Sequence, residues 1–181
     1  FNYRMTEMEA AVGIEQLKKL PNLLDQRLKN ASFFEKELSK IVGIIPPHIQ
    51  DNTLHVYYVQ AFKFKKDIIG IDRNTFLNAL KAEIPSAELR EDTPLIGAGY
   101  VKPLYLQPLY QQRATHCSFN CEKYKGSVDY SKGICPTAEK LHFEELFTHE
   151  YMRPGMEQKD LEDVVAAFHK VLDNIDELRS V

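Results

Sequence analysis

Residues 1–20 read FNYRMTEMEAAVGIEQLKKL, and they predict the first element of the fold. Thr6 and Glu9 have the spacing of a capping box, in which each side chain accepts an exposed amide hydrogen at a helix start. We therefore expect a helix from about Thr6 to Leu20, which Pro21 ends or bends. The apolar residues of this helix cover more than one face, so it is expected to pack between two bodies rather than on one core.

Two polar residues, Asn2 and Arg4, lie just before this capped helix. Free amide hydrogens and the dipole at a helix start favour an anion, and these side chains add an amide donor and a fixed cation. A phosphate or a carboxylate would suit this arrangement. Asn2 and Arg4 could equally be ordinary loop residues beside a cap, and chemistry alone does not separate the two interpretations.

Downstream of Pro21, apolar spacing predicts a second helix over residues 22–41. The run LHVYYVQAFKF, residues 54–64, is rich in β-branched and aromatic residues and predicts a strand in the centre of a sheet. Asp72 can cap a third helix, which Pro85 closes. The first half of the chain therefore combines helices with one strong strand.

The second half of the chain begins with a stretch that sustains no period. Residues 94–130 hold glycines, prolines and many aromatic residues, a composition typical of an ordered, functional loop. Pro136 suits the first turn of a helix through Phe147, and HEYMR, residues 149–153, is expected to form a short strand. Apolar residues at helical spacing between 161 and 178 predict a final helix with an acidic outer face.

This order of elements indicates an α+β class. We expect a small, mostly antiparallel sheet covered by helices and preceded by a helical connector. The connector helices are assigned to residues 1–41 and the domain to residues 42–181.

Composition and charge exclude several functional classes. The 181 residues are 44% hydrophobic and 10% aromatic, which supports a compact domain with a core. A net charge of −3 leaves no basic excess for binding nucleic acid, and the longest apolar runs are too short to span a bilayer. Three cysteines build no disulfide framework, so a reducing cytoplasm is the expected compartment. The chain begins with Phe1, which suggests a trimmed protein or a fragment.

Four residues could suggest a metal site: His116, Cys117, Cys121 and Cys135. A C-x3-C pair with one adjacent histidine lacks the paired C-x2-C spacing of structural zinc sites. Free thiols are therefore expected, and no metal.

The opening motif closely resembles the segment after the cofactor domain in the DegT/StrS family of sugar aminotransferases, which are fold-type I enzymes that use pyridoxal 5'-phosphate (PLP). Four later blocks resemble family segments in their usual order: RNTFLNALKAE, GYVKPLYLQPLYQ, CPTAEKL and RPGMEQKDLEDVVAAFHKV. The resemblance covers essentially the whole chain. It implies the C-terminal small domain of such an enzyme, without the large PLP-binding domain.

The same resemblance implies a homodimer with shared active sites. Asn2 would reach the PLP phosphate of the neighbouring subunit, and Arg4 would lie at the shared site and contact substrate. The family places the Schiff-base lysine and the acid that protonates the pyridine upstream of this chain. No catalytic residue is therefore expected here, not even Lys18 or Lys19, and the chain alone should be inactive.

The block GYVKPLYLQPLYQ resembles those of aminotransferases that act on scyllo-inosose-type cyclitol ketones. Lys102 and Tyr105 are therefore expected to contact a polyhydroxylated substrate, and His55 and Tyr57 are weaker candidates for the same wall. All four could instead pack as ordinary core or surface residues. The complete enzyme would transfer an amino group from glutamate or glutamine to a keto-sugar or keto-cyclitol.

Two other classes remain open from the sequence. A dehydratase relative would keep the fold and replace the upstream lysine with histidine. A stand-alone binding module would fold without the cofactor domain and would show no PLP chromophore.

Overall fold

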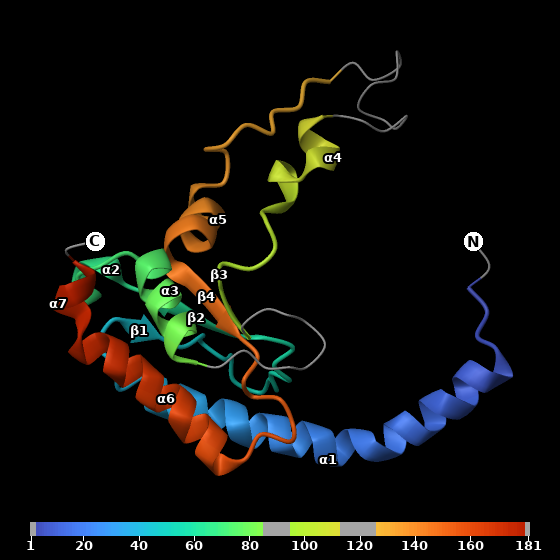
Figure 1. The fold of residues 1–181 in the computed structure, drawn as a ribbon. Coiled ribbons are helices and arrows are strands. Elements are labelled where there is room, and N and C mark those ends of the chain that lie inside the picture. Colours follow the sequence, from blue (N-terminus) through green and yellow to red (C-terminus); the bar gives the residue numbers. More distant parts are fainter. Residues whose placement is uncertain (1–2, 85–94, 113–125, 180–181) are drawn as a thin grey trace.

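The computed structural model describes residues 3–84, 95–112 and 126–179 (Figure 1). In chain order the elements are α1 (Glu7–Leu38), β1 (Ile44–Ile45), β2 (Gln60–Phe64), α2 (Lys66–Ile69), α3 (Arg73–Glu83), β3 (Ile96–Ala98), the 3-10 turn η1 (Leu104–Leu106), α4 (Pro108–Gln111), α5 (Pro136–Lys140), the π-helical turn η2 (Leu141–Glu145), β4 (Leu146–His149), α6 (Gln158–Asp173) and α7 (Ile175–Leu178).

The four strands form one antiparallel sheet in the order β1-β2-β4-β3. Phe62 of β2 pairs with Phe147 of β4, and Gln60 pairs with His149. Since successive side chains point to opposite faces of a strand, these four residues share one face, while Thr148 stands on the other. The expected α+β class with a small antiparallel sheet is confirmed.

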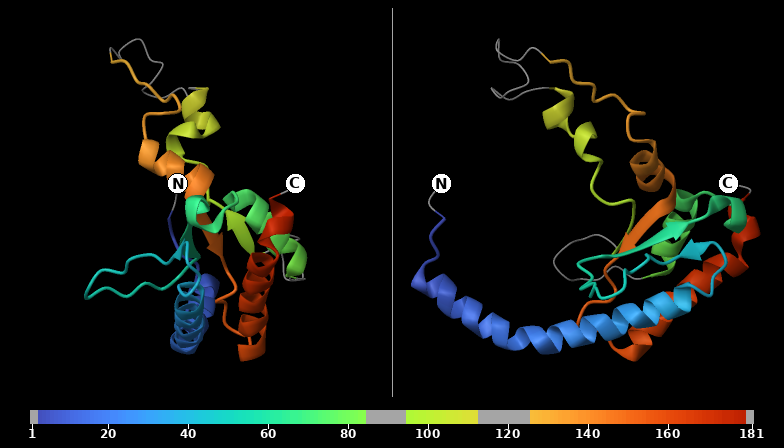
Figure 2. Two further views of the ribbon diagram at one scale, coloured as in Figure 1. Left: turned by 90° about the vertical axis from the view of Figure 1, so that its left-hand side faces the viewer. Right: turned by 180° about the vertical axis from the view of Figure 1, so that it is seen from behind.

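The core fills the space between this face of the sheet and three helices. Phe34 of α1, Phe76 of α3 and Phe168 of α6 are each completely buried. The ring of Phe34 lies 4.8 Å from that of His149, and the ring of Phe168 lies 6.0 Å from that of Phe147. The three helices therefore cover the same face of the sheet (Figure 2).

The first helix begins as its sequence predicts. The Glu9 amide donates to Thr6 Oγ1 at 3.2 Å, and the Thr6 amide donates to Glu9 Oε2 at 2.7 Å, so the capping box is present. The helix does not end at Pro21: α1 continues through this residue to Leu38, so the two helices expected on either side of Pro21 are one. A proline in a helix removes one backbone hydrogen bond and bends the helix, and packing of the following turns can offset that loss.

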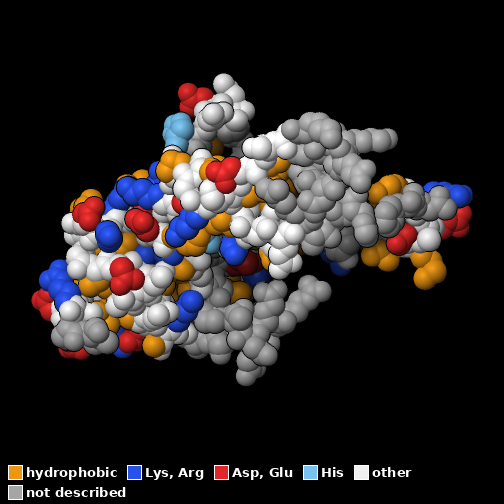
Figure 3. All heavy atoms as spheres, turned by 90° about the horizontal axis from the view of Figure 1, so that it is seen from above, with side chains coloured by type: hydrophobic (Ala, Val, Ile, Leu, Met, Phe, Trp, Pro, Cys, Tyr) orange, Lys and Arg blue, Asp and Glu red, His pale blue; other side chains and the backbone are white. Residues whose placement is uncertain are grey.

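The two halves of α1 have different surroundings. Ala31, Phe34 and Leu38 are buried against the domain, whereas Met8 and Leu17 in the first half are 81% and 66% exposed. Figure 1 shows this first half projecting along a curved path away from the sheet, and hydrophobic side chains are visible at its end in Figure 3. The rest of the face in Figure 3 mixes acidic and basic side chains.

The central strand is shorter than expected. Only Gln60–Phe64 pairs as β2, and residues 54–59 form a loop. Tyr57 has a φ of 48°, in the left-handed region that a strand does not allow, and the Arg27 guanidinium donates to its carbonyl at 2.8 Å. Tertiary contact with α1 thus overrides the strand propensity of these residues.

Two more expectations need correction in the segment before α6. The helix that starts at Pro136 becomes the π-helical turn η2 and ends at Glu145, and the following strand is Leu146–His149 rather than 149–153. Arg73, which is almost completely buried, stabilises the end of this helix by donating to the carbonyls of His142, Phe143 and Leu146 at 2.6–2.9 Å. The carbonyls of the last helical turn have no further helical amides to accept from, and the guanidinium supplies the donors.

The other helices agree with their sequence signals. Asp72 caps α3 by accepting from the amides of Asn74 and Thr75, and α6 buries its periodic apolar residues as expected. Pro85 lies outside the described residues. Strand β3 was not expected, because Ile96–Ala98 is three residues long and contains a glycine.

Candidate functional site

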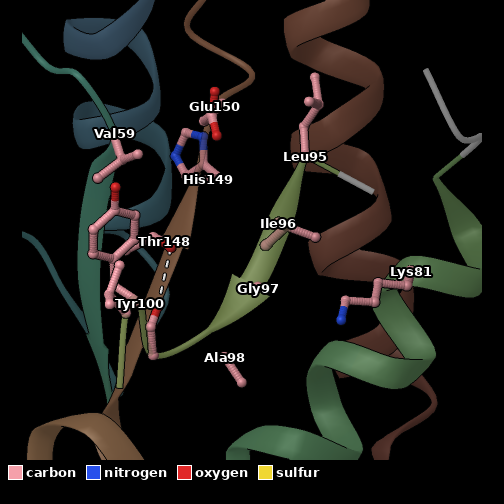
Figure 4. A pocket seen from close by; sticks show the side chains of 12 residues that line it. Val59, Lys81, Leu95, Ile96, Gly97, Ala98, Tyr100, Thr148, His149 and Glu150 are labelled. Carbon is pink, nitrogen blue, oxygen red and sulfur yellow. Dashed lines mark hydrogen bonds between the residues drawn. The ribbon is translucent and has the colours of Figure 1, made fainter. Parts of the chain in front are cut away.

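An open pocket of about 440 Å³ lies at one end of the sheet, against β3 and β4. Its lining includes Val59, Gly97, Tyr100, Thr148 and His149 (Figure 4). None of the four sequence-based substrate candidates lines the pocket, but both of their segments begin or end at it: His55 and Tyr57 shortly precede Val59 in the chain, and Lys102 and Tyr105 shortly follow Tyr100. This position makes the pocket the candidate functional site.

The floor of the pocket is held by a turn at Gly99. Thr148 Oγ1 donates to the Gly99 carbonyl at 3.1 Å, and the Gly99 amide donates to the Leu146 carbonyl at 2.6 Å (Figure 4). Gly99 has a φ of 66°, and a Cβ there would lie 2.8 Å from the Nδ1 and carbonyl oxygen of His142. Only glycine fits this turn.

Replacing Gly99 with alanine is expected to destabilise the chain by about 1–3 kcal/mol, because a side chain in the left-handed region is strained and here also meets His142. Urea denaturation measures the change. Gly97→Ala is the matched control, since a Cβ at Gly97 meets nothing within 4 Å. Equal stability of the two variants would contradict the expectation.

His149 is a completely buried titratable group beside this pocket. It is 2% exposed, and neither ring nitrogen has a hydrogen-bond partner among the described residues. Burial lowers its pKa to about 3, so the imidazole is neutral at pH 7. Sequence reasoning missed His149 as a site residue, because a single histidine in an expected strand carries no signal of its own.

Charges of both signs lie at the rim of the pocket. Figure 4 shows Lys81 on α3 pointing toward the pocket, and Glu150 follows β4 on the other side. The Glu150 carboxylate accepts from Arg153, three residues further along the chain. The lining residues thus include one cation, Lys81, and one carboxylate, Glu150, which is paired with Arg153.

His55 and Tyr57 lie together in the loop before β2 rather than on a strand. Their rings are 4.3 Å apart, and the Tyr57 amide donates to His55 Nδ1 at 2.9 Å. The Tyr57 ring is buried, and its hydroxyl lies 3.4 Å from Glu35 Oε2. Burial, and then the charge of Glu35, raise the pKa of Tyr57. Its phenol thus faces α1, while His55 is exposed.

Lys102 and Tyr105 lie on an arm formed by residues 100–112 and 126–140, which projects beyond the sheet (Figure 1). Lys102 is exposed, whereas the Tyr105 hydroxyl donates to Glu139 Oε1. The Gly133 amide donates to the same oxygen at 2.6 Å. The two sides of the arm are also joined by Gln111, whose Nε2 donates to the carbonyls of Tyr105 and Tyr130 at 2.7 Å.

Desolvation, followed by the hydrogen bond and charge of Glu139, raises the pKa of Tyr105 to about 12. Replacing Glu139 with glutamine is therefore expected to lower the pKa of Tyr105 part of the way toward its usual value of about 10. Carbon-13 NMR of labelled tyrosine rings measures this pKa, and Tyr105→Phe assigns the signal. An unchanged pKa in Glu139→Gln would show that Glu139 does not act on the phenol.

The anion-binding residues expected at the start of the chain are only partly described. Asn2 lies outside the described residues, and Arg4 is exposed just before α1. The capping box occupies the amides of Thr6 and Glu9, so the next free amides at the helix start are those of Glu7 and Met8. Two free amides and the Arg4 guanidinium are donors of the kind that a phosphate or carboxylate needs.

The other sequence expectations concern metals and membranes. Cys135 is an exposed free thiol, and His116, Cys117 and Cys121 lie outside the described residues. Within residues 3–84, 95–112 and 126–179, no group of three potential metal ligands comes together. In the same ranges no helix is both long and apolar enough to cross a bilayer.

The model of the DegT/DnrJ/EryC1/StrS aminotransferase family matches residues 1–169 of the chain. The chain belongs to this family. Among its relatives, a putative L-glutamine:3-amino-2,3-dideoxy-scyllo-inosose aminotransferase of Streptomyces kanamyceticus is 27% identical, and the match covers 98% of this chain and 41% of the relative. The spore coat polysaccharide biosynthesis protein SpsC of Bacillus subtilis is 23% identical, over 97% of this chain and 39% of that protein.

Solved structures of the DegT/DnrJ/EryC1/StrS family share the fold. DesV of S. venezuelae, in complex with a ketimine intermediate, is 20% identical with a TM-score of 0.66, over 94% of this chain and 37% of DesV. Helicobacter pylori PseC, an aminotransferase involved in pseudoaminic acid biosynthesis, gives a TM-score of 0.62 at 19% identity, over 96% of this chain and 39% of PseC. The chain therefore spans about two fifths of the length of these relatives.

Proposed function

We propose that the complete protein is a PLP-dependent aminotransferase that moves an amino group from glutamate or glutamine to the ketone of a sugar or cyclitol. The observation that carries this proposal is the family match over residues 1–169. Relatives named as L-glutamine:scyllo-inosose-type aminotransferases support the cyclitol ketone and the glutamine donor. Both candidate segments adjoin the pocket through Val59 and Tyr100, which supports a substrate-facing role for this end of the sheet.

In this proposal, residues 1–41 connect the small domain, residues 42–181, to a large domain that binds PLP. The exposed apolar side chains on the first half of α1 support packing against another body. A homodimer with shared sites would place Asn2 at the PLP phosphate of the partner subunit. It would also bring Arg4 to the substrate.

When bound, PLP would supply the electron sink that lets the amino group move. This chain would contribute binding and orientation. Arg4, a fixed cation, would hold a carboxylate of the amino donor, and the exposed cation of Lys102 would contact the acceptor. The hydrogen bond from the Tyr105 hydroxyl to Glu139 fixes the Tyr105 ring, which would therefore be held in one position at the wall of the site.

The intact enzyme with PLP tests the proposal. With L-glutamine as donor, we expect it to aminate scyllo-inosose in preference to a panel of nucleotide keto-sugars. Activity on nucleotide sugars alone would overturn the cyclitol preference. Absence of the Schiff-base absorbance after PLP is added would contradict the aminotransferase assignment and favour the dehydratase relative or the binding module.

Replacing Arg4 with alanine in the intact enzyme is expected to raise KM for the amino donor roughly 10–100-fold, which is what loss of a charged hydrogen bond costs. The fold should be unaffected, because Arg4 is exposed. Lys19→Ala, also exposed but on α1, is the matched control and should leave KM unchanged. A normal KM in Arg4→Ala would remove Arg4 from the site.

A further inference from the structure

We propose that Tyr58 and Tyr100 are positioning residues: their ring contact joins the loop of residues 46–59 to the arm and sets where Lys102 lies relative to that loop. The pair holds the two segments together and does not itself bind the substrate. The inference deepens the proposed function, and it rests on that function for one point, the contact between Lys102 and the acceptor.

The contact spans two segments that the sheet does not join to each other. The ring of Tyr58 meets that of Tyr100 edge-on, with 6.5 Å between the ring centroids. Contact with the Tyr58 hydroxyl, and then desolvation, raise the pKa of Tyr100. Tyr58 precedes β2 and Tyr100 follows β3, and β4 lies between these two strands. The hydrogen bonds of the sheet therefore cannot fix one tyrosine against the other.

Two left-handed turns bring the rings together. Tyr57 has a φ of 48° and Gly99 has a φ of 66°, so a turn of this kind directly precedes each tyrosine of the pair. The carbonyl of Tyr57 accepts from Arg27 of α1 at 2.8 Å. The carbonyl of Gly99 accepts from Thr148 of β4 at 3.1 Å. A bulky residue such as Tyr57 is strained in this region, and backbone strain clusters at functional sites. The strained turn therefore indicates a role for the residue that it orients, Tyr58.

Neither ring of the pair serves the core. Tyr58 is 72% exposed and Tyr100 is 51% exposed, whereas the neighbouring Tyr57 is buried. Substitutions of exposed residues have small effects on stability, so the domain should stay folded when the contact is removed. Figure 4 shows Tyr100 beside Val59, the residue after Tyr58, at the pocket. The pair therefore lies where the loop and the arm meet the candidate site.

The position of Tyr100 is passed on to Lys102 through a short stretch of chain. Only Val101 separates the two residues, and Pro103, which follows Lys102, has a fixed φ. Gln107 Nε2 donates to the Lys102 carbonyl at 2.9 Å, which ties this stretch to the residue after η1. Contact with Tyr58 therefore restrains the backbone from which the Lys102 ammonium extends.

Nitrogen-15 relaxation of the amides in the 181-residue chain tests the contact without PLP. We expect order parameters of about 0.85 for Val101 and Lys102 in the unchanged chain, and values below about 0.6 in Tyr58→Ala. Leu54→Ala, at a similarly exposed residue of the same loop, is the matched control and should keep the higher values. Three results would each overturn the proposal: values below about 0.6 in the unchanged chain, no fall in Tyr58→Ala, or an equal fall in Leu54→Ala.

Kinetics of the intact enzyme test the positioning role. Tyr58→Ala is expected to raise KM for the acceptor about 2–10-fold, the equivalent of one edge-on aromatic pair, and to leave kcat and KM for the amino donor unchanged. Tyr58→Phe keeps the ring and should keep KM. In a Lys102→Ala background, Tyr58→Ala should raise KM no further, because Tyr58 acts only through Lys102.

An additive rise of KM in the Lys102→Ala background would mean that Tyr58 contacts the acceptor directly, and it would overturn the proposal. An unchanged KM for the acceptor in Tyr58→Ala would do the same. A purely structural role would lower stability without separating the acceptor from the donor. If the intact enzyme has no aminotransfer activity, the proposed function fails, while the order parameters still decide whether the contact holds the arm.

Discussion

Replacing Arg73 with methionine is expected to lower the free energy of unfolding by about 3 kcal/mol or more, the largest effect of any single substitution considered for this chain. The guanidinium is 4% exposed and donates to three backbone carbonyls of the segment from His142 to Leu146. Methionine fills similar space but leaves the carbonyls of His142 and Phe143 without this donor, while the Leu146 carbonyl keeps only the Gly99 amide. Each buried carbonyl that loses its partner costs about 1–3 kcal/mol.

Urea denaturation followed by circular dichroism measures this change. Arg179→Met is the matched control, because Arg179 is about half exposed and its ion pair with Asp176 is a surface pair, worth about 0–1 kcal/mol. The Arg73 variant should also change the chemical shifts of η2 and β4, since the π-helical turn depends on the guanidinium. If Arg73→Met lowers the free energy of unfolding by less than Arg179→Met does, water replaces the guanidinium as hydrogen-bond donor without cost.

The stability of the chain is expected to fall by about 1.4 kcal/mol between pH 7.5 and pH 5.5 through His149 alone. Burial lowers the pKa of His149 from 6.5 to about 3, so the unfolded chain binds this proton first. The stabilisation from the neutral imidazole is complete above pH 6.5 and is lost as the pH falls toward 3. The effect therefore grows by about 1.4 kcal/mol for each further pH unit down to the folded pKa.

His149→Phe isolates this contribution. His142 also has a lowered pKa, because of its burial and then the charges of Arg73 and Lys102, so it contributes a pH dependence of the same sign. Asp72 and Glu145, whose pKa values are lowered by hydrogen bonds, titrate at lower pH. The difference between the unchanged chain and the variant, measured at pH 7.5 and pH 5.5, belongs to His149. A pH dependence that persists in full in the variant would contradict the prediction.

Local signals predicted the parts of the fold that depend on neighbouring residues. The Thr6–Glu9 capping box and the Asp72 cap each act over three residues, and both are present in the structure. The periodicity of α6 was predictable because one helix face meets the core along its whole length. The opening motif and the later blocks were sufficient to identify the family.

Long-range contacts account for what the sequence did not predict. The π-helical turn η2 depends on Arg73, about 70 residues earlier in the chain, and the loop at Tyr57 depends on Arg27. No local pattern contains either contact. The position of His149 opposite Gln60 could not be predicted, because it depends on the pairing of β2 with β4. The roles of Arg4, Lys102 and Tyr105 stay predictions, as do the domain boundaries.

The proline within α1 has an energetic consequence for the chain. Pro21 removes one hydrogen bond from the middle of the helix, and it separates a half that is packed on the core from a half that is exposed. Opening of the exposed half breaks no core contact, so the two halves form separate cooperative units. Amide hydrogens before Pro21 should exchange by local fraying and those after Leu28 only by global unfolding. The two halves of this continuous helix therefore differ in the free energy needed to open them, and Pro21 marks the boundary between them.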